Sequence, residues 1–188
     1  PWVPAPVPGA PGPVQYGVSE GSLDMNATAA AHYNQGMAFW AQGDMKQAQA
    51  SLQQAVQADP EAHQAWYSLG VVQERLDSPS AAKSYEKSFT VKDDYERGMV
   101  AYALYQARHG KLSEADSFLT KKRAARPKSA ALTAALAEVK SLQKDSAGAQ
   151  DLAQEALKID PSFAPAMMTI ARDYYRARQL DLSLYALQ

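Results

Sequence analysis

The three histidines are the side chains best suited to metal binding or acid–base chemistry, and they lie far apart along the chain. They are His32, His63 and His109. A helical zinc motif needs two histidines four residues apart with a carboxylate close by, and no such pair occurs. His32 falls at a position expected to be packed. His109 precedes Gly110 at an expected helix end, where positive charge is favoured. The sequence therefore predicts no metal site.

Nucleophilic, phosphate-binding and redox chemistry also lack their usual residues. The chain of 188 residues contains no cysteine, which excludes disulfides, thiolate ligands and a cysteine nucleophile. A glycine-rich phosphate loop, a nucleophile elbow and a pair of catalytic carboxylates are all missing from the sequence. We therefore expect a protein that is not an enzyme and that uses no cofactor.

The densest run of charge is basic and consists of Lys121, Lys122, Arg123, Arg126 and Lys128. Such a run is typical of the last turn of a helix, where the negative end of the helix dipole favours cations. A docking patch for an acidic surface is the alternative. No aromatic stacking platform is interleaved with these cations, and the formal net charge is −1, so we expect no nucleic-acid partner.

The elements that would position these residues are short helices that repeat at a fixed interval. Gly36 and Gly70 are 34 residues apart, whereas Gly70 and Ala103 are 33 apart. We expect the missing residue in the turn at 77–79, because loops tolerate deletions best. The spacing predicts five helical pairs over residues 29–62, 63–95, 96–129, 130–163 and 164–188, the last incomplete.

The clearest repeat runs from Ala62 to Ser88 and is anchored by Trp66, Leu69, Gly70, Ala81 and Tyr85. Its small residues let two helix backbones come close, while the large ones fill the space beside them. This stretch resembles the tetratricopeptide repeat, a helix–turn–helix unit of about 34 residues. The resemblance covers all five units. It implies an all-α fold, an α-α superhelix or tetratricopeptide solenoid of about five helix–turn–helix repeats.

Residues 1–22 differ in composition from the array at 23–188 and are predicted to form an extended tether rich in proline and glycine. We expect the first helix over about 25–42, with Asp24 or Asn26 as its cap.

Two expectations concern the ends of units. Asp59 and Pro60 are expected to begin the third helix, with the aspartate as its cap and the proline at its first position. The fifth unit stops at Gln188, part-way through its second helix. We expect the natural chain to continue beyond Gln188, with a covering partner as the alternative.

The resemblance also implies where a partner binds, because the first helix of each tetratricopeptide pair lines a concave groove. The groove positions correspond here to Tyr33, Met37, Trp40, Tyr67, Val71, Glu74, Arg97, Val100, Leu104, Arg108, Met168, Arg172, Tyr175 and Arg176. Aromatic and thioether groups collect toward the N-terminal end and arginines toward the C-terminal end. The clamp by which chaperone-binding members hold a C-terminal carboxylate is absent, since Tyr33 and Met37 replace its lysine and asparagine. For Met37 and Trp40 the alternative is packing between units.

The resemblance implies a non-catalytic scaffold that binds a peptide or helix of a partner protein in the groove. A tether ahead of such repeats is similar to bacterial cell-envelope tetratricopeptide lipoproteins of the pilus-assembly or gliding-motility type. We therefore expect a periplasmic or envelope location, with membrane attachment only through an anchor upstream of residue 1. The alternatives are a cytoplasmic co-chaperone or regulatory adaptor, and a non-catalytic arm of a larger enzyme. A further hypothesis is that the tether folds back onto the aromatic groove, where its attachment gives it a high effective concentration.

Overall fold

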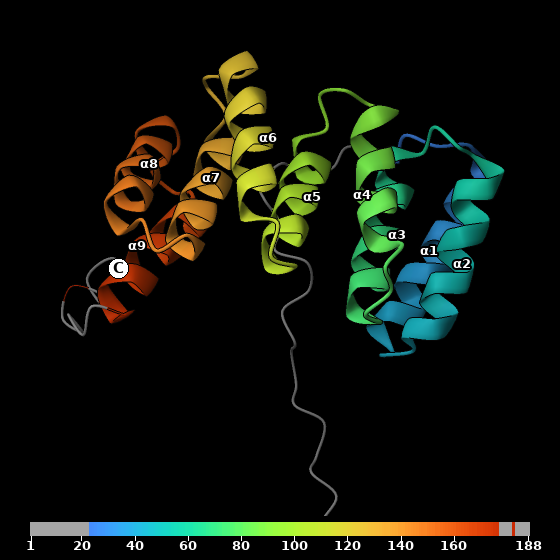
Figure 1. Ribbon diagram of the computed structural model, residues 1–188. Coiled ribbons are helices and arrows are strands. Elements are labelled where there is room, and N and C mark those ends of the chain that lie inside the picture. Colours follow the sequence, from blue (N-terminus) through green and yellow to red (C-terminus); the bar gives the residue numbers. More distant parts are fainter. Residues whose placement is uncertain (1–22, 177–181, 183–188) are drawn as a thin grey trace, which may run out of the picture.

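A computed structural model describes residues 23–176 and Leu182, and in this part the chain forms nine α-helices and no strand (Figure 1). Each helix packs against the next, and successive pairs stack side by side into a curved array. This confirms the predicted superhelix of helical pairs. The expected tether at 1–22, and all but Leu182 of the second helix of the fifth unit, lie outside the described residues. The helices are α1 (Ala27–Ala41), α2 (Met45–Ala58), α3 (His63–Arg75), α4 (Ala81–Thr90), α5 (Glu96–Arg108), α6 (Leu112–Ala125), α7 (Ala130–Leu142), α8 (Ser146–Ile159) and α9 (Ala164–Arg176).

The turn inside each of the first four pairs contains one residue with a left-handed backbone. These residues are Gly43, Asp77, Gly110 and Lys144, with φ angles of 81°, 52°, 83° and 67°. In three units a buried alanine follows the left-handed residue after five positions, but in the second unit Ala81 follows Asp77 after four. The missing residue therefore lies between Asp77 and Ala81, in the region that the sequence indicated.

The second helix of this unit, α4, is shorter than the equivalent helices by more than the one missing residue. Helix α4 has 10 residues, whereas α2, α6 and α8 each have 14. Pro79 lacks an amide hydrogen and disfavours the helical conformation of Ser78 before it. As a result, α4 begins only at Ala81, the equivalent of Ala48, which lies inside α2. The second unit is thus built with a longer turn and a shorter helix than its neighbours.

The helix caps follow the predictions in part. Asn26 caps α1 by accepting a hydrogen bond from the Ala29 amide, and Asp44 caps α2 in the same way from the Gln47 amide. The expectation for Asp59 and Pro60 was wrong, because α3 begins at His63 and Asp59 is the C-cap of α2. Its carboxylate instead accepts hydrogen bonds from the amides of Glu61 and Asn26. Asp59 thus joins the start of the first helical pair to the end of the same pair.

The core lies between the two helices of each pair and continues from pair to pair. Buried alanines such as Ala48, Ala81 and Ala115 let the helices approach, and large side chains such as Tyr85 and Leu119 fill the remaining space. The two helices of the second pair come close at Gly70, where an added Cβ would lie 2.6 Å from Cδ1 of Tyr85. The pairing of small and large residues seen in the sequence is therefore the contact that holds each pair together.

Candidate partner-binding surface

The first helices of the pairs lie on the inner side of the curve. In the C-terminal half α5 contacts α7 directly and α7 contacts α9, whereas the second helices α2, α4, α6 and α8 make no comparable contacts with one another. An array whose first helices lie closer together than its second helices must curve toward the first helices. This places the first helices, which carry the predicted groove residues, on the concave side.

The N-terminal part of this side carries a patch of five half-buried residues, which we call the aromatic patch. It consists of Tyr33, Met37 and Trp40 on α1 and Tyr67 and Val71 on α3. Ser68 Oγ donates a hydrogen bond to the Tyr33 hydroxyl at 3.3 Å and so links the two helices. Tyr33 and Trp40 also pack against the core between α1, α2 and α3. These side chains thus both support the array and keep part of their surface open.

A polar network occupies the middle of the concave side. Glu74 on α3 accepts a hydrogen bond from the Tyr85 hydroxyl at 2.7 Å. Its other oxygen accepts from Nε and Nη2 of Arg108 at 3.0 and 2.6 Å. Burial, and then the neighbouring Glu74 carboxylate, raise the pKa of Tyr85 far above its usual range, so this hydroxyl remains a donor. Glu74 therefore ties α3, α4 and α5 together.

The arginines further along the groove are also paired within the array. Arg172 Nη1 lies 3.5 Å from Glu138 Oε1. Arg176 Nη1 donates to Ser141 Oγ at 2.7 Å and lies 3.6 Å from Asp173 Oδ1. Together with Arg108, these side chains neutralise the protein's own carboxylates. These arginines are therefore weaker attractants for an acidic partner than unpaired arginines would be.

Two predicted groove residues belong to the core instead. Val100 is 0% exposed and Leu104 is 5% exposed, and both pack in the largest hydrophobic cluster. The cause lies in α7, which presents small residues such as Ala131 and Ala135 and so comes close enough to cover this side of α5. Val100 and Leu104 are therefore corrected from partner contacts to packing residues. Arg97, on the first turn of the same helix, is half-buried.

The C-terminal end of the concave side is open. Met168 and Tyr175 on α9 are 50% and 66% exposed, and they lie on one helix face with Arg172 between them. The accessible concave surface therefore has two apolar parts, the aromatic patch on α1 and α3 and the exposed face of α9. Paired charges and buried small residues separate them.

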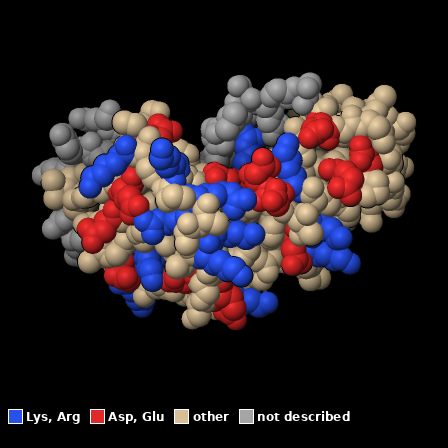
Figure 2. All heavy atoms as spheres, turned by 90° about the horizontal axis from the view of Figure 1, so that it is seen from above, with Lys and Arg blue, Asp and Glu red and all other residues tan. Residues whose placement is uncertain are grey.

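The basic run at the end of α6 is largely engaged within the protein. The Lys122 ammonium lies 5.4 and 5.5 Å from the ring centroids of Phe89 and Phe118. Arg123 pairs with Glu155 of α8. Arg126 donates to the carbonyl of Asp93 at 2.5 Å. Figure 2, which views the molecule from above, shows Lys and Arg mixed with Asp and Glu. The helix-end interpretation of the run is thereby favoured over a docking patch.

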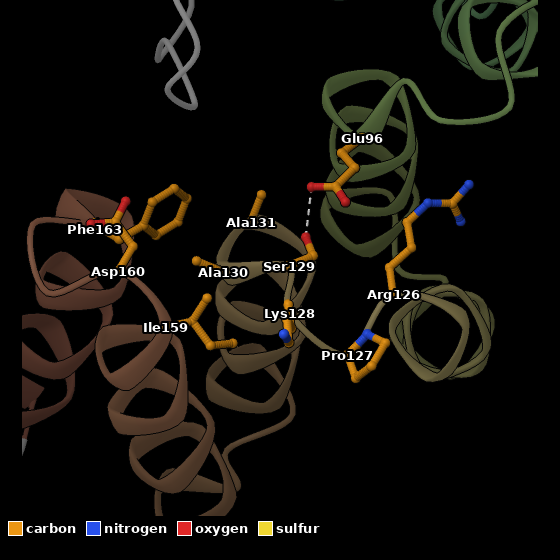
Figure 3. A pocket seen from close by; sticks show the side chains of 10 residues that line it. All are labelled: Glu96, Arg126, Pro127, Lys128, Ser129, Ala130, Ala131, Ile159, Asp160 and Phe163. Carbon is orange, nitrogen blue, oxygen red and sulfur yellow. Dashed lines mark hydrogen bonds between the residues drawn. The ribbon is translucent and has the colours of Figure 1, made fainter.

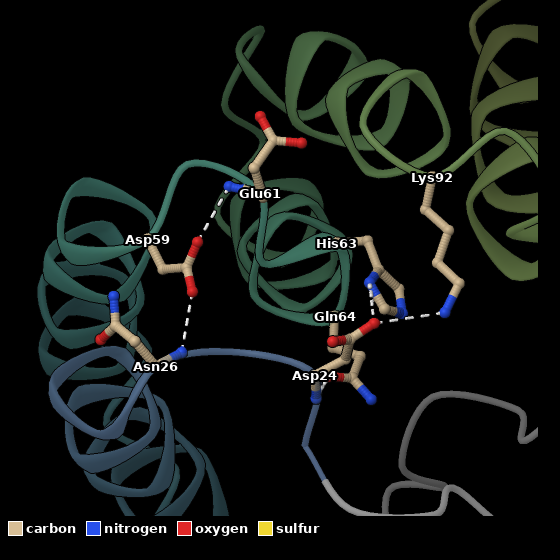
Figure 4. Close-up of polar contacts among 7 residues, drawn as sticks. All are labelled: Asp24, Asn26, Asp59, Glu61, His63, Gln64 and Lys92. Carbon is tan, nitrogen blue, oxygen red and sulfur yellow. Dashed lines mark hydrogen bonds and ion pairs between the residues drawn. The ribbon is translucent and has the colours of Figure 1, made fainter.

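A polar cluster at the start of α3 had no signal in the sequence (Figure 4). His63 is 4% exposed, and its ring packs edge-on to Tyr95, with ring centroids 4.6 Å apart. Lys92 Nζ lies 3.4 Å from Asp24 Oδ2, and His63 Nδ1 lies 4.0 Å from the same oxygen. Among the described residues no group of three or more His, Asp or Glu side chains is arranged to hold a metal ion. No described helix is long and apolar enough to span a membrane.

Comparisons with known proteins agree with this architecture. Residues 33–88 match a family model described as the tetratricopeptide repeat. No curated protein sequence matches the chain.

Several solved structures share the fold. PilW, described as a widely conserved type IV pilus biogenesis factor, is 21% identical with a TM-score of 0.70, over 87% of this chain and 77% of its own. TTC0263, a thermophilic tetratricopeptide protein of Thermus thermophilus, is 19% identical with a TM-score of 0.70, over 84% and 87%. YrrB, described as a tetratricopeptide protein with an unusual peptide-binding site, is 20% identical with a TM-score of 0.59, over 81% and 75%.

At these identities the likeness shows a common fold. The match over residues 33–88 identifies tetratricopeptide repeats in that part of the chain, and the stacked helical pairs of the other described residues have the same fold.

Proposed function

We propose that this protein is a non-catalytic scaffold that binds an apolar peptide or helix of a partner protein on the aromatic patch. The observation that carries the proposal is that apolar side chains are accessible in one part of the concave side, whereas the charged side chains in the other part are already paired. The aromatic patch offers tyrosine, tryptophan and methionine side chains that are only half-buried, whereas the groove arginines Arg108 and Arg172 are paired with the protein's own glutamates. Tyrosine and tryptophan are frequent hot-spot residues, and methionine adapts to differently shaped apolar partners.

The stacked helices favour binding of this kind. Each first helix is held by a second helix and by the next unit, so the scaffold loses little conformational entropy when a partner docks. The exposed face of α9 with Met168 and Tyr175 offers a second contact for a long partner. The description of YrrB as having a peptide-binding site supports this use of the fold.

We place this scaffold in a bacterial cell envelope, where it would organise a protein assembly. The support is the fold shared with PilW, a pilus biogenesis factor, together with the proline-rich segment that precedes the repeats. A cytoplasmic adaptor role is the rival proposal. The identity and location of the captured partner decide between the two.

The test is photo-crosslinking in cells that make the chain, with a photo-reactive amino acid at Tyr33, Tyr67 or Val71. We expect one envelope protein to be trapped from all three positions. Lys83, exposed on α4, supplies the matched control, and the same protein should not be trapped from it. Capture of a cytoplasmic chaperone from the same three positions would support the rival. Capture of the envelope protein from Lys83 alone would show that the aromatic patch is not the binding surface.

Affinity gives a second readout once the partner is known. We expect Tyr67→Ala to weaken binding by about tenfold or more, because a hot-spot truncation costs about 2 kcal/mol. Lys83→Ala should leave the Kd unchanged. Equal Kd values for the two variants would contradict the proposal.

A further inference from the structure

Residues 23–26 reach α1 along one edge of the array, at the N-terminal ends of the first helices. The Asn26 amide donates to Asp59 Oδ2 at 2.8 Å, and its side-chain amide donates to the Ala58 carbonyl at 2.8 Å. Two residues earlier, the Asp24 amide donates to Gln64 Oε1 at 2.9 Å, and the Asp24 carboxylate lies 3.4 Å from Lys92 Nζ (Figure 4). Followed backward from α1, the chain thus passes the end of α2, then the start of α3, then the loop before α5.

This direction leads to a pocket on the same edge. Lys92 is followed by Asp93, whose carbonyl accepts the hydrogen bond from Arg126, and Arg126 forms part of the pocket wall. The pocket has a volume of about 570 Å³ and lies between the α6–α7 and α8–α9 loops (Figure 3).

The chemistry of the pocket is mixed. Apolar side chains line it, namely Pro127, Ala130, Ala131, Ile159 and Phe163. Arg126 and Lys128 add positive charge, while Glu96 and Asp160 add negative charge. An apolar side chain next to a carboxylate would fit both the apolar lining and the two cations.

The pocket is the repeat equivalent of the place where Leu23–Asn26 already lies. A hollow lined by Leu23, Asp24, Asp59, His63 and Lys92 occurs at the matching positions two units earlier. Asp59 corresponds there to Arg126, His63 to Ala130 and Lys92 to Asp160. The molecule therefore already holds an extended segment of its own chain at one of the two equivalent hollows.

From this arrangement we propose that residues 14–20 continue along the edge, with the Glu20 carboxylate at Arg126 and Lys128 and an apolar side chain of 14–18 in the pocket. Residues 1–22 carry the single charged side chain of Glu20 and are otherwise apolar or uncharged, with Val14, Tyr16 and Val18 close to it. Glu20 lies four positions before Asp24, a span of up to about 14 Å when extended. In this proposal the N-terminal segment binds along the edge of the array and not in the aromatic groove.

Because the chain has no cysteine, a spin label can be attached at a single site, Val14→Cys, in the full chain. We expect the paramagnetic label to remove most of the amide signal of Ala130, Ala131 and Phe163 in ¹⁵N spectra. The amides of Tyr67 and Val71 should keep theirs. Lys128→Glu should restore most of the lost signal by repelling Glu20, whereas Lys121→Glu, an exposed matched control on α6, should not.

Three results would overturn the proposal. Signal loss centred on Tyr67 and Val71 would place the segment in the concave groove. Signal loss at no defined site would show that it does not dock. A third experiment mixes ¹⁵N-labelled chains that carry no spin label with spin-labelled chains that carry no ¹⁵N. If the Ala131 signal is lost only in this mixture, the segment in the pocket comes from a second copy of the chain.

Discussion

Glu74 connects three helices through a single carboxylate. One oxygen holds the Tyr85 hydroxyl of α4 and the other holds the Arg108 guanidinium of α5. Glu138 on α7 lies about one turn earlier in its repeat than Glu74 does, and it pairs with Arg172 in the concave groove. The two glutamates thus differ in that one has a buried phenol as a partner and the other does not.

Removal of the two glutamates should therefore have unequal effects. We expect Glu74→Ala to lower the free energy of unfolding by about 1–3 kcal/mol, because it leaves the Tyr85 hydroxyl buried without its acceptor. Glu138→Ala removes a partly exposed ion pair and should cost about 0–1 kcal/mol. Urea unfolding followed by circular dichroism measures both. Equal losses would show that Glu74 acts only as a surface charge.

His63 makes the stability depend on pH. Burial, and then the charge of Lys92, lower the pKa of its ring below the ordinary 6.5, although Asp24 and Asp94 act in the opposite direction. The unfolded chain therefore binds a proton more readily than the folded one. The contribution of His63 to stability is complete above about pH 6.5 and is lost as the pH falls from there through the lowered pKa.

The corresponding test compares the wild type with His63→Gln at about pH 7.5 and about pH 5. We expect the free energy of unfolding of the variant to fall less between the two conditions, since glutamine does not titrate. Identical losses in the two proteins would assign the pH dependence to other groups.

At the scale of the helical pair, Gly70 sets the distance between α3 and α4. An added Cβ would lie 2.6 Å from Cδ1 of Tyr85, which is 2% exposed and held by its hydroxyl. The equivalent residue of the next unit is Ala103, which shares a core with Leu119. Glycine thus occurs at this position where the large side chain is Tyr85, and alanine occurs where it is Leu119.

We expect Gly70→Ala to destabilise the protein by about 1–3 kcal/mol through this clash, although alanine favours a helix by about 1 kcal/mol. Ala103→Gly is the control, and it should lose only about 1 kcal/mol of helix propensity. Thermal unfolding gives both values. A higher Tm for Gly70→Ala would show that Tyr85 moves aside without cost.

The sequence predicts the features that follow from the repeat spacing better than those that depend on how closely two helices approach each other. The helical pairs and the buried alanines follow from the repeat spacing, because they involve residues within one unit or its neighbour. The burial of Val100 and Leu104 was not predictable, since it depends on how closely α7 approaches α5. The role of Asp59 was misjudged because its partner Asn26 lies 33 residues earlier in the sequence, at the start of the same helical pair.

At the scale of the whole molecule, the extensive contacts among the described helices lie within a unit or between neighbouring units, so stability is approximately a sum of local terms. We expect Gly70→Ala to speed amide hydrogen exchange in α3 and α4 and to leave α8 unchanged. Mass spectrometry of peptides from each helix measures this. A uniform increase along the array would show that the described units unfold as one cooperative body.

The spacing of the first helices differs along the array. In the C-terminal half α5, α7 and α9 lie in direct contact. In the N-terminal half α1, α3 and α5 approach one another much less closely and are joined by side-chain bonds such as Tyr33 to Ser68 and Glu74 to Arg108. We therefore expect the two halves of the array to differ in stiffness, with the N-terminal half easier to stretch than the C-terminal half. When the array is stretched from its ends, the half that carries the aromatic patch should extend first, so mechanical load in an assembly would act on the surface that we propose binds the partner.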